Sequence, residues 1–166
     1  MHNELTKVDI AKMREEIDAR IAMRPKLKEA VKSARDLGDL SENDEYRSAK
    51  REMNSNNSRI RYLENMIRTA VVISTDSAAG EVGLFDEVTI YYPEDEEERV
   101  IRIVTTLRND VFNDCISKES PVGKALLGKK VGQTVTVHVN ERVSYPIEIR
   151  AIKKGQDDDT LPIAKY

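Results

Sequence analysis

The sequence predicts an α+β protein in which an N-terminal antiparallel helical coiled-coil hairpin is followed by a small antiparallel β domain with one short helix. Three observations support this fold class. Apolar residues recur at three- and four-residue spacing over about the first seventy residues. β-branched residues then gather in short runs bounded by turn residues. Of the 166 residues, 34% are charged and 5% are aromatic, a composition typical of long solvated helices.

Cysteine content, hydropathy and charge exclude several classes of protein. The single cysteine rules out an internal disulfide, and two histidines make no zinc constellation. No apolar run approaches the ~20 residues that span a bilayer, and the N-terminus lacks a signal-peptide pattern, so we expect no membrane contact. Together with the single cysteine, this predicts a protein of the reduced cytoplasm, and we expect it to be a monomer. Residues 1–73 hold 15 basic and 13 acidic side chains, against 12 and 17 in residues 74–166. Because neither half is strongly basic, any contact with nucleic-acid phosphates should be confined to a small part of the surface.

The first expected helix begins at a capping box. Thr6-Lys7-Val8-Asp9 places a hydroxyl at the N-cap and a carboxylate three residues later. Pro25 removes one backbone hydrogen bond, so we expect a local bend there. The stripe at 3-4 spacing consists of Ile10, Met13, Ile17, Arg20, Arg24, Leu27, Val31 and Ala34.

A second capping box, Ser41-Glu42-Asn43-Asp44, is expected to open the next helix. Both stripes keep a seven-residue repeat through about four heptads, which predicts a coiled-coil seam. With about 30 residues in each helix, the rod would be roughly 45 Å long. The second stripe consists of Tyr46, Ala49, Met53, Asn56, Ile60, Leu63, Ile67 and Ala70.

The segment Leu37-Gly38-Asp39-Leu40 predicts a tight reversal between the helices, with Gly38 at a positive φ angle. Folding the chain there pairs positions whose numbers sum to 80. A polar layer results, which commonly sets the register of a coiled coil and lowers its stability. The expected pairs include Leu27 with Met53, Arg24 with Asn56 and Arg20 with Ile60.

The second half is expected to form strands and one short helix. In the helix, Ser120 is the N-cap, Pro121 takes the first position and Gly128 follows the last turn. The acidic run at residues 94–98 is most simply a solvated hairpin loop. The expected strands are Val71-Ser74, Val82-Tyr92, Arg99-Leu107, Thr134-Val139 and Val143-Ile152.

These patterns predict three segments along the chain. Residues 1–75 form the coiled-coil domain and residues 76–155 form the β domain. Residues 156–166, which include Asp157-Asp158-Asp159, form a disordered tail.

Acidic residues concentrate at the expected reversal, where Asp39, Glu42, Asp44 and Glu45 lie within seven residues. One explanation is local, because carboxylates are favoured near a helix N-terminus. The other is a metal site, since Asp39 and Glu42 flank the turn and are able to converge on one point. Two carboxylates alone hold Mg²⁺ weakly, because that ion keeps most of its waters. If another protein supplied the remaining ligands, a shared ion would activate water for attack on a phosphodiester.

Basic side chains accompany these acids within about three helical turns. They are Arg35, Arg47, Lys50 and Arg51. Contact with a nucleic acid or with a partner's wall is one interpretation, and an ordinary solvated helix face is the other.

Two separated motifs resemble the bacterial GreA/GreB family of transcript cleavage factors. Residues 34–46 (ARDLGDLSENDEY) are similar to that family's N-terminal motif. Ile116-Ser117 followed by residues 120–132 (SPVGKALLGKKVG) is similar to its C-terminal motif. The similarity covers roughly residues 5–152, and the sequence resembles GreA more closely than GreB.

The resemblance implies a fold and a mechanism. The C-terminal domain would be FKBP-like and would bind RNA polymerase at the rim of the secondary channel, while the coiled coil enters the channel. There the factor would stimulate the polymerase's own cleavage of backtracked RNA and would not be an enzyme by itself. Asp39 and Glu42 match the family's tip carboxylates, which help to hold a Mg²⁺ ion shared with the polymerase active site. No metal is expected to bind stably to the factor alone.

The resemblance also implies contact residues. Arg35, Arg47, Lys50 and Arg51 would contact the 3′ end of backtracked RNA or the channel wall. Ser120 and Pro121 match a loop implicated in docking to polymerase, although a helix cap explains both residue types equally well.

Departures from the family pattern leave alternatives open. Asp44 stands where the family usually has Ala, and some relatives with extra tip acids inhibit polymerase. A regulator that blocks the channel without stimulating cleavage is therefore the second hypothesis. The third is a prolyl isomerase, which would need an aromatic-lined pocket and is not transferred by fold similarity alone. Arg51 replaces a more usual acidic residue, and Asp9 stands where Gly is common.

Overall fold

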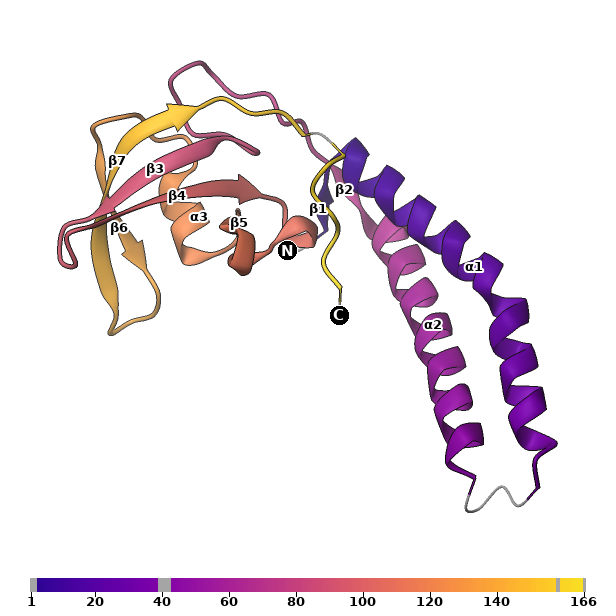
Figure 1. Cartoon of the computed structure of the whole chain (residues 1–166). Coiled ribbons are helices and arrows are strands. Elements are labelled where there is room, and N and C mark those ends of the chain that lie inside the picture. Colours follow the sequence, from indigo (N-terminus) through magenta and orange to yellow (C-terminus); the bar gives the residue numbers. More distant parts are fainter. Residues whose placement is uncertain (1–2, 39–42, 158, 166) are drawn as a thin grey trace. The chain divides into compact units, whose positions relative to one another are not determined.

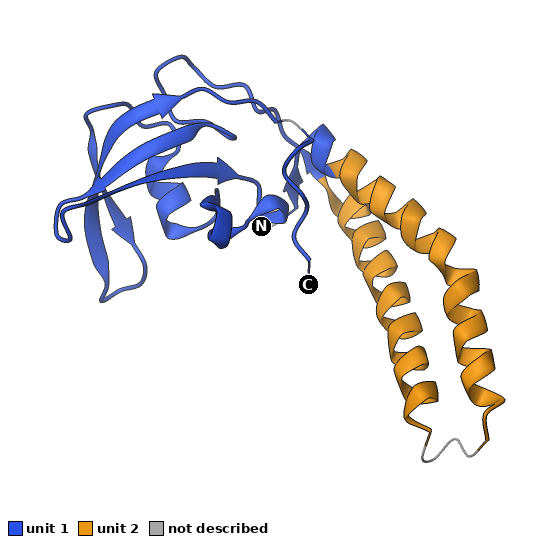
Figure 2. Ribbon diagram, in the orientation of Figure 1, with its two compact units in different colours: residues 1–9, 71–166 blue, residues 10–70 orange. Residues whose placement is uncertain are grey.

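The computed structural model describes residues 3–38, 43–157 and 159–165. The chain divides into two compact units, Ile10–Ala70 and Met1–Asp9 together with Val71–Tyr166 (Figure 2). The boundary differs from the expected one at residue 75. The reason is that a short strand near the N-terminus, Glu4–Leu5 (β1), pairs in parallel with Val71–Val72 (β2) and so joins the second unit.

The unit Ile10–Ala70 is a helical hairpin, as the 3-4 stripes predict. It contains most of α1 (Lys7–Arg35) and all of α2 (Asp44–Thr69) (Figure 1). α1 continues through Pro25 as one helix. The buried apolar residues of the hairpin are Met13, Ile17, Leu27, Val31 and Ala34 on α1, and Ile60 and Leu63 on α2. None of the helices in the described ranges has the length and apolar content needed to cross a bilayer.

The register of the hairpin differs from the expected one by about one helical turn. Asn56 lies opposite Arg20, not Arg24: its amide donates to the Arg20 carbonyl at 3.0 Å, and Arg20 Nη1 donates to Asn56 Oδ1 at 3.2 Å. Arg24 instead donates to Asn57 at 3.2 Å. The connection between the helices spans residues 36–43, since α1 ends at Arg35 and α2 begins at Asp44.

Glu16 lies beside this polar layer, between two arginines. Arg20 Nε donates to Glu16 Oε1 at 2.7 Å, and Arg59 donates to both carboxylate oxygens at 3.0 and 3.3 Å. Partial burial raises the pKa of Glu16, but the hydrogen bonds and charges of Arg59 and Arg20 outweigh it. The pKa of Glu16 therefore lies below its ordinary value of 4.5.

A Glu16→Gln variant is expected to flatten the pH dependence of hairpin stability. Because the folded pKa is lowered, the stabilisation is complete above the unfolded value and disappears as pH falls through the folded value. We expect a loss of about 1 kcal/mol near neutral pH. Thermal melts followed by helical circular dichroism should differ from wild type near neutral pH and converge in strong acid. Glu15→Gln, on an exposed neighbour, should keep the wild-type profile. A Glu16→Gln melt matching wild type at every pH would contradict the expectation.

The other unit contains a five-stranded sheet in the order β5-β4-β3-β7-β6. Its strands are β3 (Glu87–Tyr92), β4 (Glu97–Val104), β5 (Cys115–Ser117), β6 (Thr134–His138) and β7 (Ser144–Lys153). The pairs β3–β4, β3–β7 and β6–β7 are antiparallel, but β4 pairs with β5 in parallel. The sheet is therefore mixed, which corrects the expectation of an antiparallel domain.

Two expected strands have different bounds in the structure. Val82-Tyr92 is a strand only from Glu87, because Phe85 adopts a φ of 66° and the Asp86 carboxylate accepts from Gly83 N at 2.7 Å. Arg99-Leu107 ends as a strand at Val104, and Leu107 lies in a short 3-10 helix, Thr106–Arg108 (η1). The acidic run is exposed, as expected, and its last two residues begin β4.

Buried apolar residues of the sheet and of the short helix α3 (Pro121–Leu126) form one core. The Gly128 φ angle is 76°, which confirms the expected end of this helix. The most deeply buried apolar residues of this core are Phe85, Val88, Ile90, Ile103, Val104, Leu126, Val137, Ile147 and Ile149.

The capping box at Thr6 is confirmed, and it continues into a buried ion cluster. Thr6 N donates to Asp9 Oδ2 at 3.0 Å, and Asp9 N donates to Thr6 Oγ1 at 3.1 Å. Arg108, whose side chain is fully buried, pairs with Asp9 and with Asp157, each at 2.8 Å. The Arg108 guanidinium also lies 5.5 Å from the centre of the Phe85 ring.

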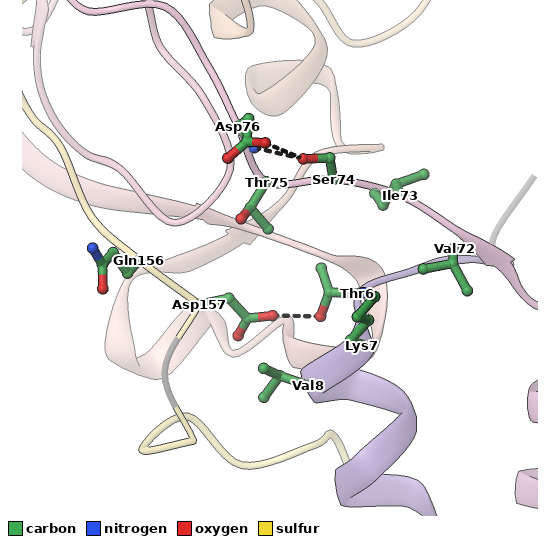
Figure 3. Close-up of a pocket in the computed structure, with 10 residues that line it drawn as sticks. All are labelled: Thr6, Lys7, Val8, Val72, Ile73, Ser74, Thr75, Asp76, Gln156 and Asp157. Carbon is green, nitrogen blue, oxygen red and sulfur yellow. Dashed lines mark hydrogen bonds between the residues drawn. The ribbon is translucent and has the colours of Figure 1, made fainter.

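The segment after β7 makes specific contacts within this unit. Asp157 accepts a hydrogen bond from the Thr6 hydroxyl, at the edge of a cavity of about 630 Å³ (Figure 3). Gly155 N donates to Asp86 Oδ1 at 2.9 Å, and Ala164 N donates to the Leu107 carbonyl at 2.7 Å. In the structure these residues are therefore hydrogen-bonded to the unit, although the sequence predicts a disordered tail.

Candidate functional site at the tip of the helical hairpin

The ends of the two helices are tied together by Asn43. Its Oδ1 caps α2 by accepting from Tyr46 N at 3.0 Å, and its Nδ2 donates to the Ala34 carbonyl near the end of α1 at 2.7 Å. The prediction that Ser41 caps this helix is wrong, because Asn43 is the N-cap. Asn is as good an N-cap as Ser, and here its amide group also donates to the facing helix.

The two candidate catalytic residues, Asp39 and Glu42, lie outside the described residues. On the side of α1, the chain leaves the helix at Arg35 and reaches Gly38, whose φ of 125° confirms the expected positive angle. On the other side, α2 begins directly after Asn43. The connection that bears both carboxylates in the sequence is therefore bracketed by helix ends that Asn43 joins.

Two of the expected basic contact residues, Arg35 and Lys50, lie at the Tyr46 ring near the start of α2. Tyr46 has the guanidinium of Arg35 and the ammonium of Lys50 each 5.8 Å from its ring centre. A hydrogen bond from Arg35, supported by the charges of Lys50 and Arg35, lowers the pKa of the Tyr46 phenol below its usual value of 10.0. Tyr46 thus lies between two cations that belong to different helices.

A basic hollow of about 590 Å³ runs along α2 from this ring. Three cations line it: Arg47, Lys50 and Arg51, of which Arg47 also lies 3.9 Å from the exposed carboxylate of Asp44. The rest of the lining is Tyr46 and the small polar residues Asn54, Ser55 and Ser58. Cations spaced along a helix beside hydroxyl and amide groups are suited to the phosphates and sugars of a single RNA strand.

In the described part of the chain, no three His, Cys, Asp or Glu side chains lie close enough together to hold a metal ion. Near the tip, Asp36, Asp44 and Glu45 are exposed, and Asp44 and Glu45 occupy the first turn of α2. Their carboxylates are favoured there by the helix dipole.

The two expected docking residues lie at the start of α3, in the other compact unit. Ser120 Oγ accepts from Gly123 N at 3.0 Å and donates to the Ser117 carbonyl at 2.6 Å, and Pro121 takes the first helical position. The predicted cap is confirmed. Next to it, Lys118 contacts Glu4 of β1, and this pairing raises the pKa of Lys118 against the effect of its burial and lowers that of Glu4.

Family models match both halves of the chain. The model described as "Transcription elongation factor, N-terminal" matches residues 3–72. The model described as "Transcription elongation factor, GreA/GreB, C-term" matches residues 76–154.

Individual proteins agree with these models. Transcription elongation factor GreA of Thermosipho melanesiensis is 42% identical over 151 residues, which are 90% of this chain and 95% of that protein. GreA of Streptococcus suis is 39% identical over 138 residues, or 82% of this chain and 86% of that protein. Among solved structures, GreA factor homolog 1 (Gfh1) of Thermus thermophilus is 23% identical with a TM-score of 0.41, and the match covers 93% of this chain and all of that one.

Proposed function

Because the chain belongs to the GreA/GreB family of transcription elongation factors, we propose that it binds RNA polymerase, inserts its helical hairpin into the secondary channel and stimulates cleavage of backtracked RNA. The factor acts as an accessory protein, and the polymerase performs the cleavage. Rescue of arrested transcription complexes in the cytoplasm is then its role.

The observation that supports this proposal most directly is the bridge made by Asn43. It joins Ala34 and Tyr46, so the helix ends on either side of residues 36–42 keep a defined spacing. A short connection closed in this way costs less ordering entropy when it meets a partner. That is the property required of a probe that must present carboxylates to another protein's active centre.

Asp39 and Glu42 would hold Mg²⁺ together with carboxylates of the polymerase. Their oxygens are the ligands that this ion prefers, and a pair of them leaves positions for ligands from the partner. When bound, the ion would supply an activated water for attack on the phosphodiester. The residues' own part is to add two negative charges and to orient the ion beside the RNA.

The basic hollow on α2 would bind the extruded RNA. Arg47, Lys50 and Arg51 attract the phosphates of the extruded RNA 3′ end, and Arg35 adds a cation from α1 across the Tyr46 ring. Ser120 and Pro121 dock the other unit at the channel rim, where the rigid cap of α3 presents a preformed surface.

The proposal is tested with a stalled, backtracked elongation complex that contains labelled RNA and Mg²⁺. Adding the protein should shorten the RNA and restore extension when nucleotides are supplied, at a rate well above that of the complex alone. Slowed nucleotide addition without cleavage would overturn the proposal and identify a channel-blocking regulator, with Asp44 as the residue to examine. Unchanged cleavage and unchanged extension would also overturn it.

A further inference from the structure

A second recessed site lies in the β-sheet unit, at the end of the sheet where the β3–β4 and β6–β7 turns meet. It is a pocket of about 230 Å³. Tyr92, at the end of β3, and Tyr145, near the start of β7, form its aromatic wall, with ring centres 6.0 Å apart and planes tilted by 36°. Val143 and Pro146 add apolar surface. Pockets for drug-sized ligands run to ~300–1,000 Å³, so this one fits a single side chain.

The rim of the pocket is acidic. Glu94 and Asp95, from the turn between β3 and β4, line it. Within the described part of the chain, neither has a lysine or arginine within 4.0 Å, so their charges are not neutralised internally. A cation in the pocket would lie among two carboxylates and two tyrosine rings.

The same hairpin already holds an arginine in this manner on its opposite face. Tyr91 and Tyr92 are adjacent in β3, so their side chains leave opposite faces of the sheet. On the Tyr91 face, the Arg150 guanidinium lies 3.7 Å from the ring centre and pairs with Glu98 at 3.4 Å. The Tyr92 face offers a ring and carboxylates of the same kind, without a cation of this chain among the pocket's lining residues.

The charged groups that act on Tyr92 are mostly acidic. Burial raises the pKa of its phenol, and Tyr145, Glu97 and Asp114 raise it further, while Arg99 lowers it. Arg99 is paired with Asp114 at 2.8 Å, so its charge is largely balanced. Glu97 and Asp114 thus place negative charge near this ring, beside one arginine whose charge is largely balanced.

We propose that the pocket between Tyr92 and Tyr145 is a recognition site for an arginine side chain presented by a basic segment of a protein partner. The rings hold the guanidinium by cation–π contact, and Glu94 and Asp95 pair with its charge at the mouth. The acidic turn is thus part of an interaction surface. This site does not depend on the cleavage activity proposed above.

The test is a titration of the ¹⁵N-labelled full-length chain with the blocked peptide Gly-Arg-Gly and with its uncharged citrulline analogue. The arginine peptide should shift the amide signals of residues 91–96 and 143–145, bind at least about fivefold more tightly than the citrulline peptide, and weaken as salt is added. Equal binding of the two peptides, or shifts confined to other regions, would overturn the proposal. So would equally tight binding of an uncharged Ala-Pro peptide, which would indicate a merely apolar pocket.

Variants separate the two parts of the site. Glu94→Gln with Asp95→Asn, in an exposed turn, and Tyr92→Leu should each weaken binding about three- to tenfold. Tyr92→Phe keeps the ring and should bind like wild type. The matched control is Asp76→Asn with Glu81→Gln, which removes the same charge from an exposed and a half-buried position, neither of which lines the pocket. If this control weakened binding as much as the rim variant, a general charge effect would replace the proposed site.

Discussion

Replacing Asp39 and Glu42 together with alanine is expected to reduce factor-stimulated RNA cleavage about 100-fold. A divalent ion contributes several kcal/mol to such a reaction, and about 2.7 kcal/mol corresponds to that factor. Without these carboxylates the shared ion would lose two ligands that the polymerase does not replace. Single-turnover cleavage of a backtracked complex at saturating factor measures the effect on the chemical step apart from binding.

The matched control for this variant is Glu52→Ala with Glu64→Ala, which removes the same charge from α2 outside the tip. It should cleave at the wild-type rate. Competition with wild-type factor for the polymerase should show that the Asp39 and Glu42 variant still binds, because its docking residues and basic hollow are intact. Cleavage by the tip variant at the wild-type rate would exclude these two residues as ligands of the shared ion.

Replacing Arg108 with methionine is expected to destabilise the β-sheet unit by about 3–5 kcal/mol. Arg108 is fully buried between Asp9 and Asp157, each 2.8 Å away. Without its guanidinium, two carboxylates of the same charge would remain out of water beside each other. Urea unfolding followed by hydrogen exchange of the sheet amides reports on this unit. The transition should shift to lower urea.

A variant with all three charges removed distinguishes charge imbalance from lost packing. Arg108→Met combined with Asp9→Asn and Asp157→Asn should recover a large part of the stability lost by Arg108→Met alone, because no buried charge remains unpaired. Asp157→Asn alone should cost less than Arg108→Met, since Arg108 keeps Asp9. An unfolding midpoint for Arg108→Met equal to wild type would show that the cluster does not stabilise the unit.

Part of the candidate site could be predicted from the sequence because its determinants are local. The positive φ of Gly38 and the basic residues of α2 follow from residue type and helical spacing within a few positions. Asn43 was missed as the bridge between the helices. Its strong preference for N-caps was visible, but its bond to Ala34 depends on how closely the two helix ends approach.

The sequence by itself determined the two long helices, the short helix α3 and five of the seven strands, and where several of them begin, whereas β1 and β5 were not predicted. The caps at Thr6 and Ser120 involve partners only three residues away, so residue type decides them. The tertiary structure decided the register at Asn56, the parallel pairing of β4 with β5, and the meeting of Arg108 with its two aspartates. These contacts join residues far apart in the chain, and their energies depend on burial and on the distance between groups. Spacing along a sequence specifies neither quantity.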